Sequence, residues 1–404
     1  MYRVLSIHET RRTLTVQYTL SGNTLTLYPA GTITSANADE FEKEINAVLA
    51  AQPYEALVMD AENLQYSTSA GLRVILRLLK RNPDFNICNV NSELYEVFEM
   101  TGFTQMMTIE KGFRRFDVTG CEVIGEGANG IVYRVDADTI IKVFRYPDAL
   151  PDIRNEQALA RKAFVMGIPT AISFDVVRVG DRYGAVYELL NAQSLCKILQ
   201  RDPGRLDECV DISVDLLKKI HGTLLQPGEM PDQRKVVLDW TRFLKDHLPE
   251  KTYEKLYALM EAIPEDHHML HGDYHVKNVM VQNGETLLID MDTLCMGHPV
   301  YEFASIYLAY AGFSAIDKTN CEKFLGLPLS LCGEFWQKTL ERYFGTTDPE
   351  KLKTIEEKAT LVANVRLLRR TIRRESDTEM GQKMIAYCKD SIITLTDKLD
   401  TLVF

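Results

Sequence analysis

The segment "HGDYHVKNVM", residues 271–280, combines residue types that phosphoryl transfer requires. Asp273 can accept or orient the proton of an attacking hydroxyl group, and Asn278, five residues later, offers an amide oxygen to Mg²⁺. Asp290, in the later segment "LLIDMD", is the natural second metal ligand, with Asp292 as the alternate. The pattern therefore predicts a catalytic carboxylate followed by a magnesium site.

Three residues of this region have plainer interpretations. A histidine in a polar loop can act as a base or can brace the loop through its ring nitrogens. We expect the bracing role for His271 and for His275. For Asp292 the stronger interpretation is a turn or capping residue.

A glycine-rich segment, "GEGANGIVY", precedes the aspartate by more than a hundred residues. Gly125, Gly127 and Gly130 lack β-carbons, so backbone N–H groups there can approach phosphates closely, and Val132 can pack on a base. Alone, this spacing is often only a tight turn. It is followed by "TIIKVF", which places Lys142 on the next predicted strand.

Lys142 lies in an apolar run, where an unpaired lysine is costly, so we expect it to bind a counter-ion and a phosphate. Glu156, in the predicted helix "RNEQALARKA", is the candidate partner. The alternative is a solvent-facing lysine on an edge strand. Farther along, the strand in "YGAVYELLNAQSL" ends at Glu188 to Leu190, whose backbone groups could bind the edge of an adenine.

Two kinds of element must position these residues. From about Phe116 the sequence alternates as an antiparallel sheet with a glycine-rich hairpin, and from Leu195 onward it is mostly helical. Two short strands flanking the turn "QNGE" interrupt the helices. The connection that precedes this unit, roughly Glu110 to Gly120, is not rich in Pro, Gly or Ser, so we expect no long flexible tether.

The first hundred residues predict a small α/β domain. Residues from Leu14 to Pro29 indicate a hairpin around "SGN", and Ser35 could cap the following helix. "YEALVMDAENL" predicts a strand covered on both faces, because Ala56 to Met59 are consecutive apolar residues. Further strand–helix alternation continues to about Ile109.

Composition excludes several classes of protein. The chain of 404 residues has a net charge of −11, which argues against general nucleic-acid binding. Its eight cysteines form no CxxC pair, so neither a zinc nor a dithiol motif is indicated. Arg3, Glu9, Arg11 and Arg12 interrupt any apolar leader, and the longest uncharged run, 303–316, is shorter than the ~20 residues of a membrane span. We expect a cytoplasmic protein with free thiols and no membrane insertion.

Glycine loop, lysine, glutamate, HxD…N and aspartate occur in kinase order, and from Gly125 to about Ala304 the chain resembles the protein-kinase-like superfamily. "HGDYHVKN" and "LLIDMDTLCMGHPVYEFA" are similar to the aminoglycoside phosphotransferase and choline kinase branch. The resemblance implies a two-lobed fold, ATP and Mg²⁺, with Asp273 as catalytic base and Asn278 and Asp290 as metal ligands.

The sequence departs from that branch at two positions. It has Lys277 where a glycine is common, which would add a cation near the phosphates, and Glu302 where an aspartate is common, for which we expect a structural role. A helix is predicted to begin near Tyr301, so there is no room for a long activation segment after Asp290. This favours a small-molecule acceptor over a dedicated protein kinase.

The first unit resembles the sulphate transporter and anti-sigma factor antagonist (STAS) domain. The matching segments are "LYPAGTITSANADEFEKEI", "ALVMDAENLQYSTSAGLRVIL" and "NVNSELYEVFEMTGF". In that family a partner kinase phosphorylates a hydroxyl in the motif D-S-S/T-G. Here the motif is Thr68-Ser69-Ala70-Gly71, so Ser69 is the candidate site. Ordinary helix capping by Ser67 and Ser69 is the alternative.

One helix, "NVRLLRRTIRRE", is rich in arginine. Arg366, Arg370 and Arg373 share a face, with Arg369 and Arg374 nearby. This is either a solvated surface or a site for an anionic acceptor or for the acidic patch of a partner.

The sequence thus predicts an α/β STAS-like regulatory domain (residues 1–115) and a two-lobed kinase-like α+β fold (N-lobe 116–190, helical C-lobe 191–404). We interpret the chain as an ATP- and Mg²⁺-dependent phosphotransferase acting on a hydroxyl-bearing acceptor. A protein partner for the STAS domain is expected. The alternatives are a nucleotide-dependent signalling switch and a kinase acting on a protein hydroxyl, including its own Ser69.

Overall fold

The computed structural model describes residues 15–127 and 129–404. The charged residues near the start, Leu14 of the predicted hairpin and Ala128 of the glycine-rich segment lie outside the described residues. The chain forms two compact units, which are described separately. The first holds residues up to Gly120 with Val176–Gly184, and the second holds Cys121–Asp175 with Ala185–Phe404.

The first unit is built on a mixed sheet with strand order β1-β2-β3-β5-β6, and β4 pairs with β2. β1 and β2 form the antiparallel hairpin predicted around "SGN", and the remaining pairings are parallel. The strands are β1 (Thr15–Ser21), β2 (Thr24–Ile33), β3 (Ala56–Asp60), β4 (Leu64–Ser67), β5 (Asn86–Val90) and β6 (Ile109–Lys111). The helices are α1 (Ala38–Ala51), α2 (Ser69–Arg81), α3 (Ser92–Met100) and α4 (Phe103–Met106).

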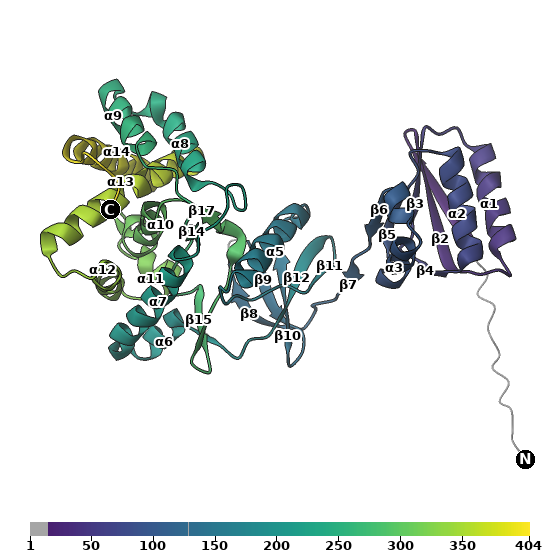
Figure 1. The fold of residues 1–404 in the computed structure, drawn as a ribbon, viewed down its shortest axis with the longest axis horizontal. Coiled ribbons are helices and arrows are strands. Elements are labelled where there is room, and N and C mark those ends of the chain that lie inside the picture. The colour runs from purple at the N-terminus through teal and green to yellow at the C-terminus, as the bar shows by residue number, and fades with distance from the viewer. Residues whose placement is uncertain (1–14, 128) are drawn as a thin grey trace, which may run out of the picture. The chain divides into compact units, whose positions relative to one another are not determined.

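Helices α1 and α2 lie side by side (Figure 1), and the ion pair between Arg77 and Glu42 joins them at 2.6 Å. Two expectations for this unit are wrong. β3 is buried on one face only, because Leu57 and Met59 are buried whereas Val58 between them is partly exposed. The helix α1 begins after Asn37 rather than after a Ser35 cap.

Local hydrogen bonds explain where α1 starts. The Asn37 side chain accepts from the Thr34 amide at 2.7 Å and donates to the Thr32 carbonyl at 2.8 Å, which closes a turn ahead of the helix. No side chain caps the helix at that position. Turn formation by asparagine competes with capping, and here the turn prevails.

The second unit begins with the predicted antiparallel sheet, in which β8, β9 and β10 are neighbours. The strands of this unit are β8 (Glu122–Glu126), β9 (Gly130–Arg134), β10 (Thr139–Phe144) and the later part of β12 (Arg182–Glu188), and helix α5 (Leu150–Val165) follows β10. β7 (Arg114–Arg115), most of β11 (Asp175–Val179) and the start of β12 belong to residues of the first unit.

The rest of this unit is mostly helical, as predicted from Leu195 onward. The helices are α6 (Leu195–Arg201), η1 (Pro203–Arg205), α7 (Leu206–His221), α8 (Gln233–Phe243), η2 (Leu244–His247), α9 (Glu250–Glu261), η3 (Met291–Thr293), α10 (Val300–Tyr310), η4 (Gly312–Ser314), α11 (Asn320–Leu325), α12 (Leu329–Phe344), α13 (Pro349–Arg374) and α14 (Glu379–Lys398). Short strands lie between them: β13 (Gln193–Ser194), β14 (Met269–Leu270), β15 (Val279–Gln282), β16 (Glu285–Leu288) and β17 (Cys295–Met296).

Helix α10 lies at the centre of this helical part, and every residue of it is buried. Phe303 of α10 packs against aromatic rings of α12, including Trp336 and Tyr343. α13 packs along α10 and α14.

All eight cysteines are free thiols. Six are buried, whereas Cys88 and Cys121 are partly exposed. None of the helices in the described ranges is both long and apolar enough to cross a membrane.

Candidate functional site

Lys142 on β10 is held by carboxylates from two distant segments. Its Nζ atom lies 3.2 Å from both carboxylate oxygens of Glu156 on α5 and 2.9 Å from Oδ1 of Asp290. The Tyr187 hydroxyl also donates to Glu156, at 3.1 Å. Burial lowers the pKa of Lys142, but Glu156 and Asp290 outweigh it and leave the pKa above its ordinary value. The ammonium is therefore charged and fixed in place.

The glycine-rich segment connects β8 to β9, and its glycines are not equivalent. A β-carbon at Gly130 would lie 2.4 Å from the Val143 carbonyl oxygen, so packing against β10 requires glycine there. At Gly125 it would make ordinary contact with Val132, and at Gly127 it would meet open space. Packing within the chain therefore explains one of the three glycines.

Asp273 lies in a loop that buried neighbours brace. His271 is fully buried, and its ring accepts from the Asp273 amide at 3.4 Å and contacts the Ile289 carbonyl at 3.3 Å. The ring of His275 lies 3.6 Å from the Asp273 carboxylate. Burial raises the pKa of Asp273, but His275, His271 and Arg366 outweigh it and hold the pKa below its ordinary value. The carboxylate is therefore ionised and able to accept a proton from a hydroxyl group.

Glu302 on α10 anchors the start of this loop. Its carboxylate is fully buried and accepts the backbone N–H groups of His271 and Gly272, the latter at 3.0 Å. Ser305, one turn farther along α10, donates to the Gly272 carbonyl at 2.7 Å. The structural role expected for Glu302 is thus explained by hydrogen bonds to the loop backbone.

The chemistry of Asn278 and Asp290 suits a hard cation. The Asn278 amide nitrogen donates to the Asp273 carbonyl at 3.0 Å, which leaves its amide oxygen available as a ligand. Asp290 has a left-handed backbone, with φ of 64°. Burial, then Asp290 and Glu156, raise the pKa of nearby Asp292 to about 7, so negative charge is in excess here.

Carboxylate and amide oxygens are the ligands that Mg²⁺ prefers, and the residues present fit it. No cluster of three or more His, Cys, Asp or Glu side chains with metal-site geometry occurs among residues 15–127 and 129–404. Mg²⁺ held by one carboxylate and one amide would therefore depend on phosphate and water oxygens for its other ligands.

Two other residues differ from what the sequence suggested. Lys277 was expected to add a cation near the phosphates, but its ammonium donates to the Phe324 carbonyl at 2.8 Å and lies over the Phe324 ring. At the end of β12, the Leu189 amide is already bonded to the Asp138 carbonyl at 2.7 Å. Glu188 and Leu190 flank this occupied amide, so an adenine edge could not use the Leu189 N–H without breaking that bond.

The arginines of α13 separate into two groups. The Arg366 Nη1 atom lies 3.4 Å from the Gly272 carbonyl and 3.2 Å from the Ser305 hydroxyl, so this residue contacts the loop that holds Asp273. Arg370 lies over the Phe313 ring and pairs with Glu375, and Arg373 is exposed. Of the three predicted acceptor-binding arginines, only Arg366 touches that loop among the described residues.

Ser69 is the first residue of α2 and is exposed. The capping alternative is wrong, because Thr68 occupies the N-cap position and no side chain makes a capping hydrogen bond. Ser67 is buried and donates to the Thr68 carbonyl. Ser69 therefore presents its hydroxyl at a helix N-terminus, where a phosphate would be electrostatically favoured.

Three contacts at the site were missed from the sequence. Tyr187 bonds Glu156, Asn129 donates to Asp292 at 3.1 Å, and Arg145 donates to the Gly127 carbonyl at 3.1 Å. Only the contact of Arg145 had a local signal. Arg145 directly follows β10, and the glycine-rich segment directly precedes β9, which pairs with β10. Asn129 and Asp292 lie far apart in sequence, so no spacing rule could pair them.

Comparison with known proteins agrees with this geometry. The profile of the "Phosphotransferase enzyme family" matches residues 120–328, which is more than half of the chain. The chain belongs to this family. A STAS domain profile matches residues 15–115, so this phosphotransferase carries an N-terminal STAS domain. The family and STAS predictions are thus confirmed, and the substrate is not identified by the match.

Individual relatives were found for each part. The first domain is similar to the "Putative anti-sigma factor antagonist BtrV" of Bordetella bronchiseptica, at 32% identity over 83 residues, 20% of this chain and 71% of BtrV. Among solved structures, ADP-bound aminoglycoside phosphotransferase APH(2'')-Ib is 14% identical, with a TM-score of 0.49, covering 76% of this chain and 99% of that chain. Aminoglycoside phosphotransferase APH(4)-Ia is 15% identical, with a TM-score of 0.48, covering 69% and 93%.

Proposed function

We propose that this phosphotransferase moves the γ-phosphate of ATP to a hydroxyl group of a small molecule, with Mg²⁺ as cofactor. The observation that carries the proposal is the Lys142 ion pair with Glu156 and Asp290, next to a braced and ionised Asp273. A purely structural ion pair would not need the aspartate loop beside it.

Each residue has a defined task in this proposal. Lys142, positioned by Glu156, holds the phosphates of ATP, and Asp273 takes the proton of the acceptor hydroxyl. The hydroxyl oxygen then bonds to the γ-phosphorus as the bond to the β–γ bridging oxygen breaks, and ADP leaves with that oxygen. Mg²⁺, bound by Asn278 and Asp290, would offset the phosphate charge.

The remaining predicted residues surround the nucleotide in the same proposal. The backbone of Gly125, Gly127 and Gly130 would cover the phosphates, and Val132 would contact the base. The backbone groups of Glu188 and Leu190 would lie at the adenine edge, and the Leu189 N–H would stay bonded to the Asp138 carbonyl. Residues 116–190 would then form the nucleotide lobe, and 191–404 would carry the acceptor site.

A small acceptor is favoured by the short connection after the metal site. Only residues 291–299 separate Asp290 from α10, and η3 and β17 occupy part of that stretch. A protein substrate would need an extended docking segment in this position. The connection between Asp290 and α10 is too short to contain such a segment.

An acceptor screen with the full chain tests the proposal. Transfer of labelled phosphate from ATP is measured with Asp273→Ala and with Asp215→Asn as the matched control, because Asp215 is an exposed carboxylate of α7 in the same lobe. We expect transfer with the wild type and the control and a loss of at least ~100-fold in Asp273→Ala. Equal transfer by all three proteins would refute the role of Asp273. Binding of ATP with no transfer to any compound would instead favour a nucleotide-dependent signalling switch.

The exposed hydroxyl of Ser69 favours a second candidate activity, self-phosphorylation of the STAS domain. Residues 1–115 would then act as a regulatory module with a protein partner, consistent with the name of the relative BtrV. Intact mass after incubation with MgATP is the test. A gain of one phosphate that disappears in Ser69→Ala supports it. An unchanged mass in enzyme that phosphorylates another acceptor rejects it.

A further inference from the structure

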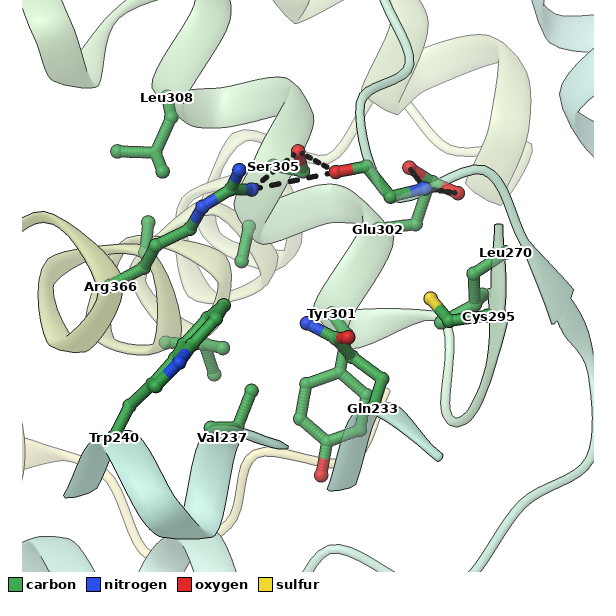
Figure 2. Close-up of a pocket in the computed structure, with 14 residues that line it drawn as sticks. Gln233, Val237, Trp240, Leu270, Cys295, Tyr301, Glu302, Ser305, Leu308 and Arg366 are labelled. Atoms are coloured by element: carbon green, nitrogen blue, oxygen red, sulfur yellow. Dashed lines mark hydrogen bonds between the residues drawn. The ribbon is translucent and has the colours of Figure 1, made fainter. Parts of the chain in front are cut away.

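A small pocket lies beside the catalytic loop, between α8, α10 and α13. Figure 2 shows Arg366 of α13, Trp240 of α8 and Ser305 of α10 around it, and Gly272 completes the wall next to Asp273. The cavity measures about 20 Å³, which is room for about one water-sized group. It can therefore take a single oxygen atom of a bound molecule whose remainder lies outside.

Arg366 gives this pocket a preference for anions. Its hydrogen bonds in the described ranges run from Nη1 alone, to Gly272 and Ser305. The guanidinium edge formed by Nε and Nη2 is left without a protein acceptor there. That edge is a planar fork of two N–H groups, which matches the two oxygens of a carboxylate or a phosphate.

Two aromatic side chains of α8 pack against two arginines of α13. The guanidinium of Arg366 lies 5.8 Å from the centre of the Trp240 ring, and that of Arg369 lies 5.9 Å from the same ring and 5.8 Å from Phe243. Burial, and then the neighbouring arginines Arg373 and Arg374, lower the pKa of Arg369. Positive charge is thus gathered on this side of the loop.

No acidic side chain of the pocket wall is free to bind a positively charged acceptor. Glu302 is the single acidic residue among those that line it in the described chain, and it is fully buried. Both of its oxygens accept backbone N–H groups of the catalytic loop, at His271 and Gly272. A cationic group in the pocket would therefore meet Arg366 with no compensating carboxylate in the pocket wall, and the ionised carboxylate of Asp273 beyond Gly272 is the one that faces the acceptor hydroxyl in this proposal.

We propose that the acceptor of this phosphotransferase is a hydroxyl compound that carries a carboxylate or phosphate group, bound by the free edge of Arg366 against Trp240. One oxygen of the anion would enter the pocket and the rest of the group would lie at its mouth, while the hydroxyl points to Asp273, one residue beyond Gly272. This inference rests on the proposed phosphotransfer at Asp273 and adds the chemical class of the substrate.

Anion binding can be measured without turnover. The protein has two tryptophans, and Trp240 is partly exposed at the pocket whereas Trp336 is buried in the core. Tryptophan fluorescence of the full chain is titrated with glycerate, glycerol phosphate, glycerol and glucosamine. These probes share hydroxyl groups and differ in carboxylate, phosphate, no charge and positive charge. The titration is repeated with Arg366→Gln and with Lys351→Gln, which removes one exposed charge from the far end of α13.

We expect a saturable change with glycerate, glycerol phosphate or both, and none with glycerol or glucosamine. The anion affinity should fall about 10- to 100-fold in Arg366→Gln and stay unchanged in Lys351→Gln, because Arg366 makes charged hydrogen bonds to the ligand. Which of the two anions binds identifies the headgroup. Saturable binding of glucosamine or glycerol alone, no binding of either anion, or equal anion binding in Arg366→Gln would overturn the proposal.

Kinetics with the acceptor found by the screen separates the two inferences. Arg366→Gln should raise the KM for an anionic acceptor more than it lowers kcat, whereas a merely structural role would lower kcat and leave KM unchanged. If a neutral or cationic acceptor is phosphorylated with an unchanged KM in Arg366→Gln, the proposed phosphotransfer stands and the anion inference fails. If the anions bind but no phosphate is transferred, the proposed function fails and anion binding stands.

Discussion

Replacing Glu302 by glutamine tests how the loop that holds Asp273 is anchored. The carboxylate accepts two backbone N–H groups, from His271 and Gly272, in a fully buried position. Glutamine keeps one acceptor oxygen and turns an NH₂ group toward the other donor. One charge-assisted hydrogen bond is lost, so we expect the free energy of unfolding of the helical lobe to fall by about 1.5–3 kcal/mol. That is a large part of the 5–15 kcal/mol typical of a domain.

The same substitution should reduce turnover, because Asp273 follows directly after the anchored residues. A shift of the loop by a fraction of an ångström misplaces its carboxylate, and we expect kcat to fall about tenfold or more. Both tryptophans, Trp240 and Trp336, lie in the helical lobe, so fluorescence in urea reports the unfolding of that lobe. Phosphate transfer is measured on the same preparations.

Glu322→Gln is the matched control, since Glu322 is an exposed carboxylate on nearby α11. We expect its unfolding midpoint and its kcat to equal those of the wild type. If Glu302→Gln unfolds at the same urea concentration as this control and keeps full kcat, the two hydrogen bonds do not anchor the loop and the reasoning is refuted.

Three further substitutions test other contacts. Gly130→Ala should destabilise the sheet of β8, β9 and β10 by about 1–3 kcal/mol, because the β-carbon meets the Val143 carbonyl, and calorimetric melting would measure it. Glu156→Gln should raise the KM for ATP about tenfold, because Lys142 loses one of its two carboxylates. Burial lowers the pKa of His298 below 6.5, so the folded state resists protonation of this residue. The free energy of unfolding of the wild type should therefore fall as the pH drops below about 6.5. His298→Asn keeps an acceptor for the Val300 amide, and its urea unfolding should lack that fall.

Each of these has its own control. Gly127→Ala should melt like the wild type, because a β-carbon there meets open space. Tyr187→Phe removes a hydrogen bond to Glu156 but no charge, so its KM for ATP should change less than that of Glu156→Gln. Equal effects within either pair would contradict the cause assigned to it, as would a pH dependence that survives in His298→Asn.

The sequence predicted those parts of the site that depend on order along the chain. Lys142 and Glu156 could be paired because one lies on a strand and the other on the helix that follows it. Ser35 was predicted wrongly as a cap because Asn37 makes competing local hydrogen bonds. β4 was missed because a strand of four residues with outer positions buried shows no alternation.

The contacts that could not be predicted join distant segments. The face shared by Arg366, Arg370 and Arg373 was visible in the helical spacing, but packing against Trp240 on α8 decides which of them reaches the loop. Lys277 was predicted to lie near the phosphates because it lies between Asp273 and Asn278 in the sequence, and its bond to the Phe324 carbonyl depends on where α11 folds. Helical spacing predicts which residues share one face of a helix, whereas the tertiary fold determines which residues that face contacts.

The distribution of thiols in this chain provides a natural pair of labelling sites. Of the eight cysteines, only Cys88 and Cys121 are partly exposed, and they belong to different compact units. Burial raises the pKa of Cys88 to about 11, so maleimide dyes should react with Cys121 first near neutral pH and with Cys88 at higher pH. Sequential labelling of the unmodified protein with a donor and an acceptor dye would then let energy transfer measure the separation of the STAS domain and the phosphotransferase domain, and how nucleotide changes it.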